Sequence, residues 1–141
     1  MNAATSLAKP GALPRSVALV GNPNCGKTAL FNLLTGARQK VANYAGVTVE
    51  RKVGQARLPN GQTVAIIDLP GTYSLHPASA DELVTLEVIE GRRTGEDAPD
   101  LIVAVVDATN LRMNLRLVLE LKRLGRPMLV ALNMADMAEE R

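Results

Sequence analysis

Short apolar runs alternate along this chain with segments in which apolar residues recur every three or four positions. The apolar runs predict strands over residues 16–20, 63–67, 101–107 and 128–132, of which the first two are expected to be buried and the third central. The helical spacing predicts helices between them, over residues 29–35, 83–89 and 111–119. Strands that alternate with helices predict an α/β fold of three layers, with a mostly parallel sheet between helices on both faces.

The segment 47–58 departs from this pattern because its apolar residues alternate with polar ones, as in a strand with one covered face. The residues that share one parity are Val47, Val49 and Val53. Residues 59–62, Pro-Asn-Gly-Gln, are a hairpin turn signal, and so short a turn requires an antiparallel pair. We therefore expect one antiparallel edge strand. Residues 38–46 have no periodicity and are predicted to form a loop.

Polar residues and glycines mark the ends of the helices. Ser79 and Glu82 have the spacing of a capping box before the second helix. Gly125 and Pro127 end the third helix. We expect Leu111, Leu115, Val118 and Leu119 to lie on one face of this third helix.

Composition and charge agree with one folded domain. The chain has 141 residues, 47% of them hydrophobic, which is enough for a core. The net charge is +2 and the basic residues are scattered, so nucleic acid is not an expected ligand. One cysteine excludes an internal disulfide. The longest apolar run, over residues 101–106, is far below the roughly 18 residues of a membrane span, so we expect a soluble chain.

The two ends of the chain differ from its middle. Residues 1–14 are small and polar, with two prolines, and predict a flexible leader. Residues 15–141 are predicted to form one domain that is incomplete at its C-terminus, because the chain stops soon after the 128–132 strand. That strand would then be a sheet edge with uncovered apolar surface, and we expect either self-association or mobile C-terminal residues.

The segment Gly21–Thr28 carries the strongest chemical signal. Its sequence, Gly-Asn-Pro-Asn-Cys-Gly-Lys-Thr, fits the phosphate-binding pattern G-x-x-x-x-G-K-[ST] between a predicted strand and a predicted helix. In such a loop, backbone N–H groups and the helix N-terminus converge on a polyphosphate. Lys27 would reach the β- and γ-phosphates, and the Thr28 hydroxyl would bind Mg²⁺. The alternative is a glycine turn that binds nothing. The pattern in this context predicts a nucleoside triphosphate site.

Two further motifs point to the same edge of the sheet. Asp68 ends a buried strand in the sequence Asp-Leu-Pro-Gly, where its carboxylate would face Mg²⁺. Gly71 has no side chain, so its N–H can approach the γ-phosphate. Thr48 lies in the loop between these motifs and could give Mg²⁺ a second hydroxyl. Taken alone, Thr48 would be an ordinary surface threonine.

The segment Asn133–Asp136 predicts which base is bound. Asp136 can accept two hydrogen bonds from the N1–H and N2–H₂ edge of guanine, which adenine lacks. Asn133 would brace the phosphate-binding loop, and the apolar stem of Met134 could lie on the base. These residues favour GTP and GDP.

Five segments together resemble the cytosolic GTPase domain of the bacterial ferrous iron transport protein B family (FeoB). They are Gly21–Thr28, Asn43–Glu50, Asp68–Leu75, Asp107–Leu111 and Asn133–Asp136. The resemblance extends from Arg15 to about Met137 and implies a P-loop NTPase fold of the Ras-like kind. In that family a helical domain and a membrane domain that carries Fe²⁺ follow, so the parent protein would lie at the cytoplasmic face of the bacterial inner membrane. This sequence lacks the fifth guanine motif, the last strand and helix, and any membrane segment.

The resemblance also implies a nucleotide site built from these segments and a hydrolytic activity. The nucleotide-binding residues are Gly21, Asn22, Pro23, Asn24, Cys25, Gly26, Lys27, Thr28, Gly46, Val47, Thr48, Val49, Glu50, Asp68, Leu69, Pro70, Gly71, Asn133, Met134, Ala135 and Asp136. Those expected to act in catalysis are Asn24, Lys27, Thr48 and Gly71, and those expected to hold Mg²⁺ are Thr28, Thr48 and Asp68.

Two positions bear on the rate of hydrolysis. Thr72 stands where Ras-like proteins have a glutamine that orients water, so slow turnover is expected. By resemblance, Asn24 would help to hold K⁺ near the phosphates, or else would only shape the loop. Two other functions stay open: a module that senses GTP with little turnover, and a ribosome- or RNA-linked GTPase.

Overall fold

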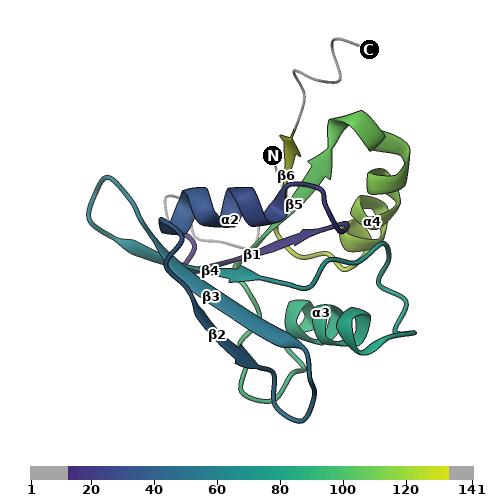
Figure 1. Cartoon of the computed structure of the whole chain (residues 1–141), viewed down its shortest axis with the longest axis horizontal. Coiled ribbons are helices and arrows are strands. Elements are labelled where there is room, and N and C mark those ends of the chain that lie inside the picture. The colour runs from purple at the N-terminus through teal and green to yellow at the C-terminus, as the bar shows by residue number, and fades with distance from the viewer. Residues whose placement is uncertain (1–12, 134–141) are drawn as a thin grey trace.

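The computed structural model describes residues 13–133. These residues form a six-stranded sheet with helices on both faces (Figure 1). The strands are β1 (Ser16–Gly21), β2 (Lys40–Asn43), β3 (Glu50–Arg57), β4 (Thr63–Asp68), β5 (Leu101–Asp107) and β6 (Met128–Asn133). The helices are α2 (Lys27–Thr35), α3 (Ala80–Glu90), the 3₁₀ turn η1 (Ala108–Asn110) and α4 (Leu111–Arg123).

The sheet has the order β2-β3-β4-β1-β5-β6. Strand β1 pairs in parallel with β4 and β5, and β5 pairs in parallel with β6. Strand β3 pairs antiparallel with both β2 and β4. The predicted α/β fold with a mostly parallel sheet is therefore confirmed. In such sheets ligands bind beyond the carboxyl ends of the parallel strands.

The loop predicted over residues 38–46 is wrong in part, because Lys40–Asn43 form the edge strand β2. All four side chains of β2 are exposed, so the strand has no buried face to create an apolar period. Its backbone pairing with β3 holds it in place. The hairpin strand β3 consequently lies inside the sheet, and it begins at Glu50 rather than at residue 47.

Two apolar clusters lie on opposite faces of the sheet. Val17 and Leu19 of β1 pack with Phe31 of α2 on one face. Ala18 and Val20 pack on the other face with residues of α3 and α4. Because successive residues of β1 serve different clusters, its sequence is a continuous apolar run. Figure 1 shows the three layers that result, with α2 on one side and α3 and α4 on the other.

The apolar face predicted for α4 is not the face that packs on the sheet. The residues of α4 that the fold buries are Asn114, Leu117 and Leu121. Asn114 points inward because its Oδ1 accepts from the N–H of Asp107 (3.0 Å) and its Nδ2 donates to the carbonyl of Asn110 (2.8 Å). This polar anchor leaves Leu111, Leu115 and Leu119 exposed, and Val118 half-buried.

The predicted helix limits are confirmed at the start of α3 and at the end of α4, which Gly125 follows in the left-handed conformation (φ 71°). The Ser79 hydroxyl accepts from the N–H of Glu82 (3.2 Å), as a capping box requires. Gly36 follows α2 in the left-handed conformation. Among residues 13–133, no helix has the length and apolar character needed to cross a membrane.

The two chain ends are described only in part. The predicted leader lies outside the described residues except for Leu13 and Pro14, and residues 134–141 also lie outside them. Strand β6 is the last in the order of the described sheet, and Leu129, Val130 and Leu132 are each about half exposed. Self-association through this surface stays a prediction.

Candidate functional site

A cavity of about 720 Å³ lies at the carboxyl ends of β1 and β4, beside the first turn of α2. It brings together most residues that the sequence assigns to the nucleotide. The predicted residues that line it are Asn22, Pro23, Asn24, Gly26, Lys27, Thr28, Thr48, Val49, Glu50, Asp68, Leu69, Pro70 and Gly71. The two cavity residues that sequence reasoning missed are Lys52 and Asp81.

The loop between β1 and α2 owes its shape to two residues with left-handed backbones. Asn24 has φ 64° and Gly26 has φ 95°, conformations that asparagine and glycine adopt at the least cost. Within the described residues, no side chain caps the N-terminus of α2. The first N–H groups of this helix are therefore available to an anionic ligand in the cavity.

Lys27 and Asp68 form a buried ion pair inside the cavity. Lys27 Nζ donates to Asp68 Oδ1, and the two side chains are 10% and 4% exposed. Lys27 opens α2 and Asp68 closes β4, so the β1–β4 pairing brings them together. A cation and a carboxylate with little solvent access are poised to serve a ligand that carries both phosphate and a metal ion.

The segment Tyr44–Val49 forms a turn that carries Thr48 to the cavity. The N–H of Tyr44 donates to the carbonyl of Val49 (2.9 Å), and the N–H of Val47 donates to the carbonyl of Tyr44 (3.3 Å). The side chains of Tyr44 and Val49 are buried in the core, whereas Thr48 is exposed. Burial, with the Glu96 carboxylate nearby, raises the pKa of Tyr44 to about 12.

Asn133 reaches the phosphate-binding loop as the sequence predicts. Its Nδ2 donates to the carbonyl of Cys25 (3.1 Å). A Cβ at Gly26 would lie 1.7 Å from the same nitrogen, so only glycine allows this approach. Cys25 itself is buried, and burial raises the pKa of its thiol. Met134, Ala135 and Asp136 lie outside the described residues.

Besides Asn133, four described residues that were assigned to the nucleotide do not line the cavity. Gly21 and Cys25 pack beneath the loop, where a Cβ on Gly21 would meet Cys25 Sγ at 2.5 Å. Gly46 lines a separate small cavity on the far side of the Tyr44–Val49 turn, and Val47 packs against the core. Their contribution is to the shape of the two loops.

Lys52 could have been found from the sequence. Counting outward from the turn at residues 59–62 pairs Arg57 with Thr63 and Lys52 with Asp68, which is the observed register. Lys52 therefore had to lie beside the end of β4. Asp81, in the first turn of α3, depends on the path of the loop after Gly71 and carries no comparable signal.

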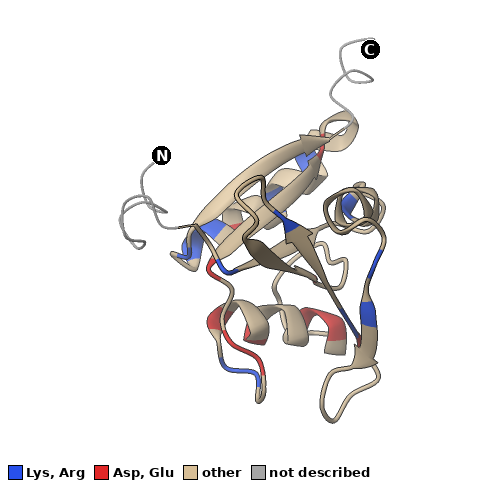
Figure 2. Cartoon of the chain, turned by 90° about the vertical axis from the view of Figure 1, so that its left-hand side faces the viewer, with Lys and Arg blue, Asp and Glu red and all other residues tan. Residues whose placement is uncertain are grey.

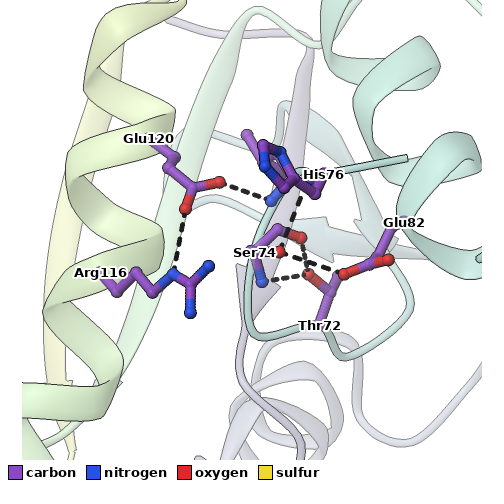
Figure 3. Close-up of polar contacts among 7 residues, drawn as sticks. Thr72, Ser74, His76, Glu82, Arg116 and Glu120 are labelled. Carbon is purple, nitrogen blue, oxygen red and sulfur yellow. Dashed lines mark hydrogen bonds and ion pairs between the residues drawn. The ribbon is translucent and has the colours of Figure 1, made fainter. Parts of the chain in front are cut away.

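The segment that follows Gly71 is held by a polar network (Figure 3). Thr72 is buried, its N–H donates to the carbonyl of Gly21 (3.0 Å), and its hydroxyl bonds Ser74. Ser74 Oγ donates to Glu82 of α3 (3.2 Å), and the N–H of Leu75 donates to Glu120 of α4 (2.7 Å). These contacts fix Gly71 against the loop, where a Cβ would lie 3.1 Å from Pro23 Cα.

Comparisons with known proteins agree on one family. The family profile described as "Ferrous iron transport protein B" matches residues 15–141. The Fe(2+) transporter FeoB of Salmonella typhimurium is 53% identical over 125 residues, which cover 89% of this chain and 16% of that protein. This chain belongs to the ferrous iron transport protein B family.

Solved structures of the family share this fold. The G domain of the T. maritima FeoB iron transporter is 42% identical with a TM-score of 0.78, covering 89% of this chain and 76% of that one. A mutant of S. thermophilus NFeoB bound to GDP is 45% identical with a TM-score of 0.77, covering 89% of this chain and 46% of that one. The chain thus spans a small part of its full-length relative and a larger part of these domains.

Proposed function

We propose that this chain binds guanine nucleotides and hydrolyses GTP slowly, as a regulatory domain of a ferrous iron transporter. The observation that carries the proposal is the buried Lys27–Asp68 pair inside a cavity lined by the phosphate-binding loop. The S. thermophilus relative bound to GDP supports the guanine nucleotide. The triphosphate lies along the loop, with Lys27 at its β- and γ-phosphates.

The residues that would hold Mg²⁺ fit that ion. Thr28, Thr48 and Asp68 each offer oxygen, the donor that Mg²⁺ prefers, and all three line the cavity. When bound, Mg²⁺ would neutralise charge on the phosphate oxygens. Asp68 gains this partner as Lys27 turns to the phosphates, so neither buried charge is left alone.

Hydrolysis transfers the γ-phosphoryl group to water, breaking the bond from the γ-phosphorus to the β–γ bridging oxygen. Backbone N–H groups at the start of α2 and the Lys27 ammonium stabilise the charge that gathers on the phosphate oxygens. The N–H of Gly71 donates to the γ-phosphate. Thr48 closes the cavity over the nucleotide and limits the access of bulk water.

Asn24 is assigned to a K⁺ ion at the phosphates. Asn24 lines the cavity with a left-handed backbone and an exposed side chain, whose amide oxygen can bind a cation. This ion would supply positive charge where other GTPases use an arginine. Asn133 braces the loop, and Asp136 would read the guanine base.

A second candidate function is nucleotide sensing with little turnover. Thr72, at the position after Asp68–Gly71, is buried and its hydroxyl is bonded to Ser74. It cannot orient an attacking water, which favours a site that binds more readily than it hydrolyses. Multiple turnovers under GTP excess support the first function, and a single turnover or none supports the second.

The wider role follows from the family. In the parent protein this domain would lie at the cytoplasmic face of the bacterial inner membrane. It would be attached to a helical domain and to a membrane domain, and the membrane domain would carry Fe²⁺. The nucleotide state would bias transport through the loops that contact the γ-phosphate.

Release of phosphate from GTP with Mg²⁺ tests the proposal. Lys27→Ala should abolish release, but it also leaves Asp68 as an unpaired buried carboxylate. Thr28→Ala avoids this problem because the Thr28 side chain is exposed, and it should lower release at least about tenfold through loss of the Mg²⁺ ligand. Lys122→Ala on α4 is the matched control. Full activity of both site variants would overturn the proposal.

A further inference from the structure

The loop between α3 and β5 reaches the turn that carries Thr48. Arg93 in this loop donates through Nη2 to the carbonyl of Ala45, and its Nη1 bonds Glu87 of α3 at 2.9 Å. Ala45 and Arg93 are 48 positions apart in the sequence. Figure 2 shows this loop below α3, with basic residues on one arm and acidic residues on the other.

A second ion pair ties the same loop to the other end of the turn. Arg51 Nε donates to Glu96 Oε2 at 2.8 Å, and Arg51 follows the first residue of β3. The side chains of Arg93 and Glu96 are each 13% exposed, so both pairs are partly shielded from water. The loop between α3 and β5 therefore contacts the outer side of the turn near both of its ends.

The inner side of the turn has a different task. Tyr44 and Val49 anchor its base in the core, and Thr48 lines the nucleotide cavity. The outer residues Ala45 and Gly46 are exposed and carry no apolar anchor, and Gly46 has φ 79°. Among the described residues, the hydrogen bond from Arg93 to the carbonyl of Ala45 is the polar contact that other elements make with this outer half of the turn.

We propose that Arg93 is a positioning residue, which holds the Tyr44–Val49 turn in the shape that presents Thr48 to the nucleotide. The inference rests on the proposed function, because it concerns how Thr48 meets Mg²⁺ and the γ-phosphate. Arginine suits the role since one planar fork serves Glu87 and Ala45 at once, whereas lysine offers a single nitrogen. The adjacent Arg92 bonds Glu90 instead.

The position of Thr48 affects the two nucleotides differently. Thr48 serves the γ-phosphate, which a diphosphate lacks, and the metal ion that the γ-phosphate helps to hold. Loss of the contact from Arg93 should therefore weaken the binding of a triphosphate and leave the affinity for GDP nearly unchanged. Replacement of a residue that merely supports the fold would weaken the binding of both nucleotides alike.

The test is the affinity of the 141-residue chain for a fluorescent, non-hydrolysable GTP analogue with Mg²⁺ and for fluorescent GDP. Arg93→Ala should lower the affinity for the analogue about three- to tenfold, the usual effect of losing one charged hydrogen bond that is partly exposed. GDP should change by less than about twofold. Arg93→Lys should lie between, and Arg92→Ala, the matched control, should equal the parent.

A double-mutant comparison shows whether Arg93 acts through Thr48. In a Thr48→Ala background, Arg93→Ala should lower the affinity for the analogue no further. Equal losses for both nucleotides, an undiminished effect in the Thr48→Ala background, or an Arg93→Ala variant equal to the parent would each overturn the inference. A parent chain that binds neither nucleotide would overturn the proposed function as well, so the two failures are distinct.

Discussion

The side-chain amide of Asn133 donates to the carbonyl oxygen of Cys25 at 3.1 Å, joining the end of the last described strand to the phosphate-binding loop. The contact is possible because Gly26 has no side chain to occupy the space that Asn133 Nδ2 fills. The parallel order β1-β5-β6 brings these residues together, although 108 positions separate them. The loop is thus held by the segment expected to read the base.

Removal of this brace should weaken nucleotide binding without unfolding the chain. Asn133→Ala is expected to lower GTP-analogue affinity about fivefold, the value of a hydrogen bond worth ~1 kcal/mol. Fluorescence titration measures the loss, and Asn32→Ala on the exposed face of α2 is the control. If Asn133→Ala binds as tightly as the control, the contact with Cys25 does not shape the site.

Tyr44 should tolerate the loss of its hydroxyl. The ring is 2% exposed, and the hydroxyl has no hydrogen-bond partner among the described residues. Tyr44→Phe should therefore leave the free energy of unfolding unchanged or raise it by up to ~1 kcal/mol. Tyr44→Ala should lower it by about 3–5 kcal/mol, the usual cost of emptying an aromatic core position. Urea denaturation compares them, and destabilisation by Tyr44→Phe would show that the hydroxyl has a partner.

Burial of Tyr44 also predicts a pH dependence of stability. Its pKa is raised from 10.0 to about 12 in the folded chain, so the folded protein keeps a proton that the unfolded chain releases. This contribution is fully present below pH 10 and is lost as the pH rises toward 12. Urea midpoints measured across that range should fall in the parent and fall less in Tyr44→Phe. Parallel falls in the two proteins would contradict the assignment to Tyr44.

The assignment of K⁺ to Asn24 predicts a difference between two salts. GTP hydrolysis should be faster in KCl than in NaCl at equal ionic strength, because K⁺ adds positive charge at the phosphates. Asn24→Ala should remove the difference while nucleotide binding persists. One rate in both salts for the parent would show that Asn24 has another role, and only the comparison of salts bears on it.

The sequence was enough to predict the parts of this fold that depend on local signals. Strands β1, β4, β5 and β6 are continuous apolar runs, and the loop Gly21–Thr28 has fixed spacing, so both could be identified directly. Strand β2 could not, because it is exposed on both faces and depends on pairing with β3. The buried face of α4 could not be identified from the sequence, because Asn114, a polar residue, takes an inward position.

In the candidate site, too, the residues with local sequence signals could be predicted and those that depend on tertiary contacts could not. The phosphate-binding residues belong to motifs, and Lys52 could be placed by its register opposite Asp68. The contact between Arg93 and Ala45 has no such signal, because it joins two irregular segments whose meeting depends on the packing of α3 against the sheet. Contacts of this kind require the three-dimensional structure.

Nucleotide competition tests the central claim most directly. A fluorescent GDP bound to the chain should be displaced by GTP and GDP at similar concentrations, and ATP should require at least about tenfold more, because adenine lacks the donor pair that Asp136 accepts. This preference should weaken in Asp136→Ala. Displacement by ATP at the same concentration as by GTP would contradict the account of this chain as a guanine-nucleotide domain.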